Sequence, residues 1–213
     1  MNVKLKICGL MRQEDVALCC QVGVDICGFV TEYPIHVPWN LTRERCAELL
    51  RSVAPPTKSC IVTGGSREHI LDLALALRPN LIQLHYHETA ADTKYLVRVL
   101  APHGIGVIKT ISPGEDIDAL CSAKVYALLV DARGPANAAS GGDANLEFYR
   151  RVKSSADCPV MLAGGITTKN IQSTISAATP DIIDVMSGVE SAPGIKSRKK
   201  IIELAAAFAG SLC

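Results

Sequence analysis

The sequence predicts a (β/α)8 barrel that spans residues 1–213 as a single domain. Short apolar runs alternate eight times with segments of helical periodicity. The runs show little polar alternation, which is typical of parallel strands buried on both faces. An open, doubly wound sheet usually has only about five or six strands, so eight repeats favour a closed barrel. The length of 213 residues suits a compact barrel, because the fold typically takes about 250 residues.

Each expected strand is a short run rich in Val, Ile and Leu, and each is followed by a segment with helical spacing. We expect strands at residues 3–7, 25–30, 58–62, 81–84, 106–110, 126–130, 159–163 and 182–185. We expect helices at residues 13–22, 42–53, 66–77, 90–100, 115–121, 146–154, 167–178 and 197–209. Ser66 and Thr167 are the kind of residue that begins a helix, since their hydroxyl oxygens accept bonds from free backbone N–H groups.

Composition excludes several classes of function. The formal net charge is +1, and the short basic cluster from Lys196 to Lys200 is typical of the solvated start of a helix. We therefore expect neither a nucleic acid nor an anionic membrane as a partner. No apolar run approaches the roughly 20 residues of a membrane span, and no signal peptide precedes the first strand. These features predict a soluble, cytoplasmic protein.

The cysteines and the absence of known motifs argue against a cofactor. The chain has 9 cysteines, an odd number, and they do not form two CxxC pairs. Several of them, such as Cys27, Cys60 and Cys158, lie in or beside apolar strands, which indicates reduced core thiols. No cluster of His, Asp or Glu has metal-ligand spacing, and no P-loop or GxGxxG motif is present. We expect no metal and no cofactor.

Two turns of small residues follow the last two expected strands. They are Gly164-Gly165 and Ser187-Gly188. Backbone N–H groups in such turns are unobstructed by side chains and can bind a phosphate without Lys or Arg. In (β/α)8 barrels the loops after strands 7 and 8 often form a phosphate site. The sequence therefore predicts a small phosphorylated molecule as the partner.

A thiol and a carboxyl group follow the first and sixth strands, almost across the barrel from one another. An ionised Cys8 could accept a proton, and a protonated Asp131 could donate one, as a proton shift on a bound sugar requires. Cys8 could equally be one more inert core thiol. Asp131 has the stronger case, because a carboxylate at the end of a buried strand is costly unless it is paired or used.

Other polar groups at the same edge leave two interpretations open. His85 could bind an anionic group or be a buried, hydrogen-bonded residue. The turn Gly64-Gly65 could be a second anion site or a loop without a ligand, and Glu32 could serve the site or be solvated.

Five segments resemble the phosphoribosylanthranilate isomerase family of tryptophan biosynthesis. They occur in the family's order at strands 1, 4, 6, 7 and 8, so the resemblance covers the whole chain. The segments are KICGL (6–10), QLH (83–85), LLVDAR (128–133), LAGGI (162–166) and DVMSGVESAPGIK (184–196).

The resemblance implies a cofactor-free Amadori rearrangement, an intramolecular oxidation and reduction. The substrate would be N-(5-phosphoribosyl)anthranilate and the product 1-(2-carboxyphenylamino)-1-deoxyribulose 5-phosphate. It further implies that Cys8 is the general base and Asp131 the general acid, that Asp184 contacts the ribose hydroxyls, and that the protein is a monomer or homodimer. The phosphate would lie against Gly164, Gly165, Ser187 and Gly188.

The chain also departs from the family pattern. Pro38 lies near the position of an arginine that holds the anthranilate carboxylate in the family, so His85, Arg133 or another residue would have to replace it. The loop after the sixth strand places Asp143 close to the expected phosphate site. Two alternatives therefore remain open. The protein could be an isomerase for a different phosphoribosyl amine, or a barrel that binds a sugar phosphate without catalysis.

Overall fold

The computed structural model describes residues 3–132 and 144–211, and it confirms the predicted (β/α)8 barrel. Parallel strands close into a ring in chain order, with β8 paired to β1. The strands are β1 (Lys4–Ile7), β2 (Ile26–Val30), β3 (Lys58–Thr63), β4 (Leu81–Leu84), β5 (Gly106–Thr110), β6 (Ala127–Asp131), β7 (Val160–Ala163) and β8 (Ile182–Val185).

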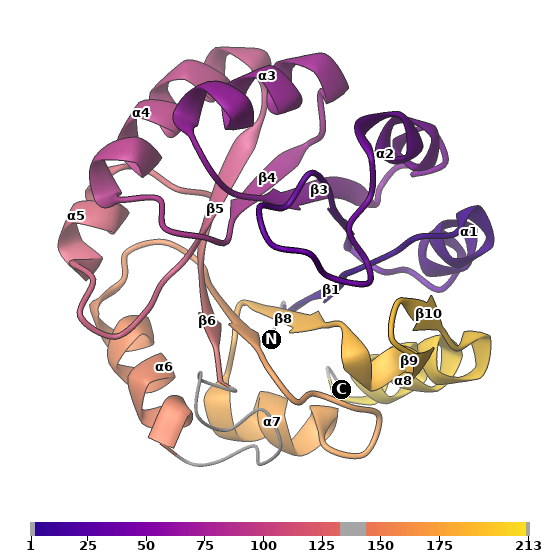
Figure 1. Cartoon of the computed structure of the whole chain (residues 1–213). Helices are drawn as coiled ribbons and strands as arrows, with labels where there is room; N and C mark the ends of the chain where they lie inside the picture. The colour runs from indigo at the N-terminus through magenta and orange to yellow at the C-terminus, as the bar shows by residue number, and fades with distance from the viewer. Residues whose placement is uncertain (1–2, 133–143, 212–213) are drawn as a thin grey trace.

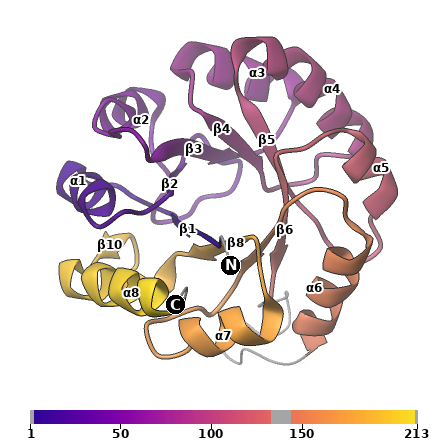
Figure 2. The ribbon, with the colours of Figure 1, turned by 180° about the vertical axis from the view of Figure 1, so that it is seen from behind.

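A ring of α-helices surrounds the strands, as Figures 1 and 2 show from opposite sides. The helices are α1 (Gln13–Gln21), α2 (Arg43–Leu50), α3 (Arg67–Leu77), α4 (Ala90–Leu100), α5 (Ile117–Ser122), α6 (Ala144–Ser155), α7 (Ile171–Ala178) and α8 (Arg198–Gly210). The last helix packs beside the first and completes the ring. Within residues 3–132 and 144–211, no helix is long and apolar enough to cross a membrane.

The alternation of side chains along each strand decides which residues reach the site. In β6, Leu128 and Val130 pack in the large cluster that includes helix residues, whereas Ala127 and Leu129 pack inside the barrel. Asp131 has the same parity as Ala127 and Leu129, so it belongs to the inner face. The same rule places Lys6, Cys8, Gln83, His85 and Asp184 on the inner face at the carboxyl ends of their strands.

The structure differs from the sequence prediction around the last two strands. Helix α7 begins at Ile171, not at Thr167, because the Asn170 side chain accepts a bond from the Thr167 N–H at 2.7 Å and holds a turn there. After β8 the chain forms a short 3-10 turn, η2 (Ser187–Val189), and a hairpin of β9 (Glu190–Ala192) and β10 (Ile195–Lys196) that was not predicted. Another 3-10 turn, η1 (Ala101–His103), follows α4.

The prediction that Lys196 is a solvated residue at the start of the last helix was wrong. Its side chain is 0% exposed, and its Nζ donates to Glu190 Oε1 and to the Met186 carbonyl, each at 3.0 Å. Burial of a lysine charge is tolerated because these acceptors replace water. Lys196 thereby ties the hairpin to the end of β8.

Candidate active site

A cavity of about 210 Å³ lies at the carboxyl ends of the strands. Catalytic sites of (β/α)8 barrels are found at this end. Most of the residues singled out from the sequence line it, namely Cys8, His85, Asp131, Gly164, Gly165, Asp184 and Ser187. Gly188 is not part of the lining, and Arg133 and Asp143 lie outside the described residues.

A buried ion pair lies beside the cavity, and its aspartate is part of the lining. Lys6 in β1 and Asp184 in β8 are neighbours in the strand register, and Lys6 Nζ donates to Asp184 Oδ2 at 2.8 Å. Desolvation lowers the pKa of Lys6, but the charges of Asp184 and the nearby thiols outweigh it and raise that pKa above the ordinary value. Lys6 therefore remains a cation. The other oxygen of Asp184, Oδ1, is buried without a partner among the described residues, so it can accept a hydroxyl of a ligand.

Cys8 follows directly after β1 and is almost fully buried, with 5% of its surface exposed. Burial raises the pKa of its thiol, and the positive charge of Lys6 opposes this shift only in part. At neutral pH the resting group is therefore a thiol. Lys6 is the group best placed to stabilise a thiolate, because its charge is buried and close to the sulfur.

Asp131 is the last residue of β6, and its register partner is Ala163 in β7, next to the Gly164-Gly165 turn. His85 lines the cavity from the end of β4. Burial lowers the pKa of His85, although the charge of Asp131 acts in the opposite direction. His85 is therefore a neutral imidazole at neutral pH. The Tyr33 hydroxyl donates to the backbone carbonyl of His85 at 2.6 Å.

The turns after β7 and β8 are in direct contact. Gly164 and Gly165 have φ values of 101° and 66°, in the left-handed region that glycine tolerates best. A Cβ on Gly188 would come within 1.9 Å of the Ile166 carbonyl oxygen, so only glycine allows this approach. The Asn170 amide donates to the Gly165 carbonyl at 3.0 Å, and this bond ties the turn to the residue before α7.

The opposite wall of the cavity is apolar and aromatic. Val30 and Val62 pack with Cys8, and Tyr33 and Trp39 from the loop after β2 pack against them. Pro38 belongs to the same loop. No Lys or Arg among the described residues lines the cavity.

Two groups that the sequence left open have partners within the protein. Glu88 is buried, and its carboxylate accepts bonds from the backbone N–H groups of Gly65 and Tyr86, each at 3.0 Å. The turn after β3 therefore already holds an anion, which is a side chain of the chain itself. Glu32 is paired with Arg43 through two bonds of 3.1 Å.

Sequence reasoning missed four residues of this site: Lys6, Tyr33, Trp39 and Gln83. Lys6 carried a signal, because a charged residue within a buried strand has to be paired or used. Gln83 carried a similar signal, because it is a polar residue within the buried strand β4. Its Oε1 is buried without a partner among the described residues. Tyr33 and Trp39 carried none, since aromatic residues in a long loop do not reveal which way they face.

The comparisons with known proteins agree with this geometry. A family model described as N-(5'phosphoribosyl)anthranilate (PRA) isomerase matches residues 5–207. The chain is 31% identical over 204 residues to the N-(5'-phosphoribosyl)anthranilate isomerase of Halobacterium salinarum, with 93% of this chain and 92% of that protein covered. Identity to the enzyme of Desulfatibacillum aliphaticivorans is 34% over 206 residues, covering 94% and 90%.

Solved structures extend the likeness to the fold. The phosphoribosyl anthranilate isomerase of Thermus thermophilus superposes with a TM-score of 0.80 at 26% identity, covering 98% of this chain and 99% of that one. A phosphoribosyl anthranilate isomerase in complex with reduced 1-(o-carboxyphenylamino)-1-deoxyribulose 5-phosphate gives a TM-score of 0.78 at 27% identity, with the same coverage. The chain therefore belongs to the N-(5'-phosphoribosyl)anthranilate isomerase family.

Proposed function

We propose that Cys8 and Asp131 are the base and the acid of the Amadori rearrangement for which this family is named. The chain is a phosphoribosylanthranilate isomerase of tryptophan biosynthesis, and it converts N-(5'-phosphoribosyl)anthranilate into 1-(2-carboxyphenylamino)-1-deoxyribulose 5-phosphate. The observation that supports the assignment is that a thiol, a carboxyl group and two small-residue turns line one cavity.

The reaction needs one proton on oxygen and one proton off carbon. Asp131 protonates the furanose ring oxygen, which opens the ring and leaves a protonated Schiff base at C1. The Cys8 thiolate then removes the C2 proton and yields an enolamine. The enolamine becomes the ketone when C1 gains a proton and the C2 hydroxyl loses one. These transfers restore both side chains, so the balance is an isomerisation.

Substrate binding divides between the two walls of the cavity. The phosphate lies against the backbone N–H groups of the turns after β7 and β8, which include Gly164, Gly165, Ser187 and Gly188. A sugar hydroxyl donates to the free Oδ1 of Asp184. Because Lys6 holds Oδ2, the carboxylate is fixed before the sugar binds, and fixed groups lose less entropy on binding.

The aromatic ring of the substrate lies against Val30, Val62 and Trp39, where the apolar wall meets Cys8. Its carboxylate cannot rely on an arginine at position 38, and His85 is neutral. Arg133 is thus our candidate for the positive partner, with Trp39 as a neutral donor. The same apolar wall supports a second candidate function, the isomerisation of a phosphoribosyl amine whose ring lacks the carboxylate.

Replacement of the two proposed groups tests the mechanism. Cys8→Ser and Asp131→Asn should each lower turnover by at least about 100-fold, the usual effect of a positioned base or acid. Cys20→Ser, which removes a partly exposed thiol in α1, serves as the matched control and should leave turnover unchanged. Equal turnover in all of these proteins would exclude the assignment.

Growth of a tryptophan auxotroph that lacks the isomerase tests the substrate. The wild-type gene should restore growth, and the Cys8→Ser gene should not. If a well-folded wild-type protein fails to restore growth, a panel of phosphoribosyl amines with and without a ring carboxylate identifies the second function.

A further inference from the structure

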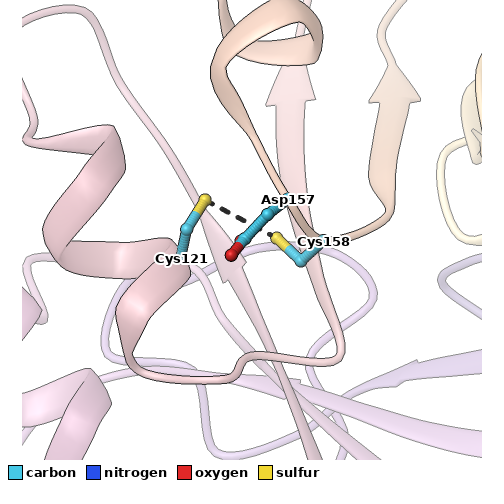
Figure 3. Close-up of side chains that lie close together, drawn as sticks. All are labelled: Cys121, Asp157 and Cys158. Carbon is cyan, nitrogen blue, oxygen red and sulfur yellow. Dashed lines mark hydrogen bonds between the residues drawn. The ribbon is translucent and has the colours of Figure 1, made fainter.

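Two cysteines and an aspartate converge at the end of the barrel opposite the cavity (Figure 3). Cys121 lies near the end of α5, and Asp157 and Cys158 lie in the link between α6 and β7. Because this link precedes β7, it belongs to the amino-terminal ends of the strands. The candidate active site lies at their carboxyl ends, so the cluster is separate from it.

The distance between the two sulfur atoms suits a bound metal ion. The Sγ atoms of Cys121 and Cys158 are 3.8 Å apart, and both are free thiols. With Zn–S bonds of about 2.3 Å, tetrahedral geometry places two sulfur ligands about 3.8 Å apart. A disulfide would instead require the sulfurs to approach to about 2.05 Å. A metal ion can therefore enter between them without moving either sulfur.

Asp157 supplies a third ligand atom. The ligand atoms of the three residues all lie within 4.8 Å of one another. A tetrahedral zinc ion requires about 3.5 Å between a sulfur and a carboxylate oxygen, so the oxygen has to move by no more than about 1.3 Å. The Asp157 side chain is exposed, and no ion pair or hydrogen bond to a described residue holds it. It is therefore free to make this movement.

We propose that Cys121, Asp157 and Cys158 bind one thiophilic divalent cation of the Zn²⁺ type. Two thiolates and one carboxylate form three corners of a tetrahedron, and a water molecule completes it. Binding releases the two thiol protons to solvent, so affinity increases with pH. The sequence held no sign of the site, because its cysteines are 37 residues apart and the ligands meet only in the folded chain.

The bound ion has a structural role. It joins the end of α5 to the entry of β7, across the segment that contains β6. A ligand that binds only the folded chain stabilises it. We therefore expect Zn²⁺ to raise the melting temperature while turnover stays the same.

Titration of the reduced protein with Co²⁺ and then Zn²⁺ tests the site. Thiolate ligands give Co²⁺ an intense charge-transfer absorption, and Zn²⁺ affinity follows from competition with a coloured chelator. We expect one equivalent to bind, with affinity reduced more than about 100-fold by Cys121→Ser or Cys158→Ser, since even the partners of metal ligands contribute 10–100-fold. Asp157→Asn should weaken binding less, and Cys20→Ser should leave it unchanged.

Melting temperatures measured with and without Zn²⁺ show whether a serine variant has lost the metal site or has failed to fold. The serine variants should melt cooperatively without metal and gain nothing from Zn²⁺, whereas the wild type and Cys20→Ser should gain. The proposal is overturned if one equivalent binds equally well to the serine variants, or if the wild type binds none.

Discussion

Two Gly-Gly turns at the mouth of the barrel have similar local sequences but differ in whether a side chain of the protein occupies them. Thr63-Gly64-Gly65 follows β3, and Ala163-Gly164-Gly165 follows β7. In the first turn the Gly65 N–H donates to the buried carboxylate of Glu88. The second turn lines the cavity, and the space where a Cβ of Gly165 would lie is open. A glycine turn is thus an anion site only where no side chain of the protein occupies it.

The two buried carboxylates beside these turns differ in the same way. Glu88 uses both of its oxygens on backbone N–H groups, whereas Asp184 gives one oxygen to Lys6 and leaves the other buried without a partner among the described residues. The turn after β3 is therefore closed by its own hydrogen bonds. The side of β7, β8 and β1 keeps groups available for a ligand.

Among the substitutions that test this difference between the two carboxylates, removal of the Lys6 charge should have the largest effect on stability. Lys6→Met leaves Asp184 as an unpaired buried charge, which should lower the free energy of unfolding by about 3–5 kcal/mol. Lys199→Met is the control, because that side chain is 83% exposed and its loss should cost less than about 0.5 kcal/mol. Urea unfolding of both variants measures the difference. Equal stabilities would show that the buried pair contributes nothing.

A methyl group on Gly188 should push apart the turns that follow β7 and β8. Gly188→Ala forces the turn after β8 away from the Ile166 carbonyl, and a displacement near 1 Å at a binding site costs about 100-fold in kcat/KM. Gly210→Ala is the control, because it adds a methyl group at the end of α8, where the nearest atom is the far end of the flexible Gln172 side chain at 3.2 Å, so its kcat/KM should not change. Steady-state kinetics of the two variants provide the test. An unchanged KM in Gly188→Ala would contradict the phosphate assignment.

Loss of the Glu88 carboxylate should affect stability and leave catalysis intact. Glu88→Ala leaves the N–H groups of Gly65 and Tyr86 without acceptors, at a cost of about 1–3 kcal/mol in the free energy of unfolding. The control is Glu68→Ala, on the exposed face of α3. Unfolding experiments and kinetics on both variants distinguish the roles. A large rise in KM for Glu88→Ala would mean that the turn after β3 binds substrate after all.

The pH dependence of kcat/KM should be flat and then fall. In the reactive protonation state, Asp131 carries a proton and Cys8 is a thiolate. In the resting state, Asp131 is a carboxylate and Cys8 is a thiol. Both states hold one proton in total. Their ratio does not depend on pH. The pair loses its last proton only through the pKa of Cys8, which burial raises. We therefore expect a decline of about tenfold per pH unit that begins above the ordinary thiol value of about 8.5.

A pH profile measured from neutral to strongly alkaline solution checks this sign. A decline that begins near pH 7 would mean that the Cys8 pKa is lowered and not raised. In Lys6→Met the decline should begin at a still higher pH, since the charge that favours the thiolate is gone.

Much of the candidate site could be predicted because the sequence shows the order of the strands and which alternate residues of each strand share a face. Once eight strands are recognised, alternation places Cys8, His85, Asp131 and Asp184 on the inner face at one end. Contacts between distant segments could not be predicted in this way. The pairing of Glu88 with Gly65, the burial of Lys196 and the late start of α7 depend on side chains that meet only in the folded protein.

Apolar periodicity and the small-residue turns by themselves predicted the barrel, which the structure confirms, and the strand ends at which we propose the active site and the phosphate site, because both signals are local and repeat along the chain. Tertiary structure alone decided which glycine turn is open, which carboxylate keeps a free oxygen, and that Cys121 meets Cys158. The physical reason is that a hydrogen bond or a metal ligand acts over a few ångströms of space. Such distances are set by the packing of distant segments and not by their separation in sequence.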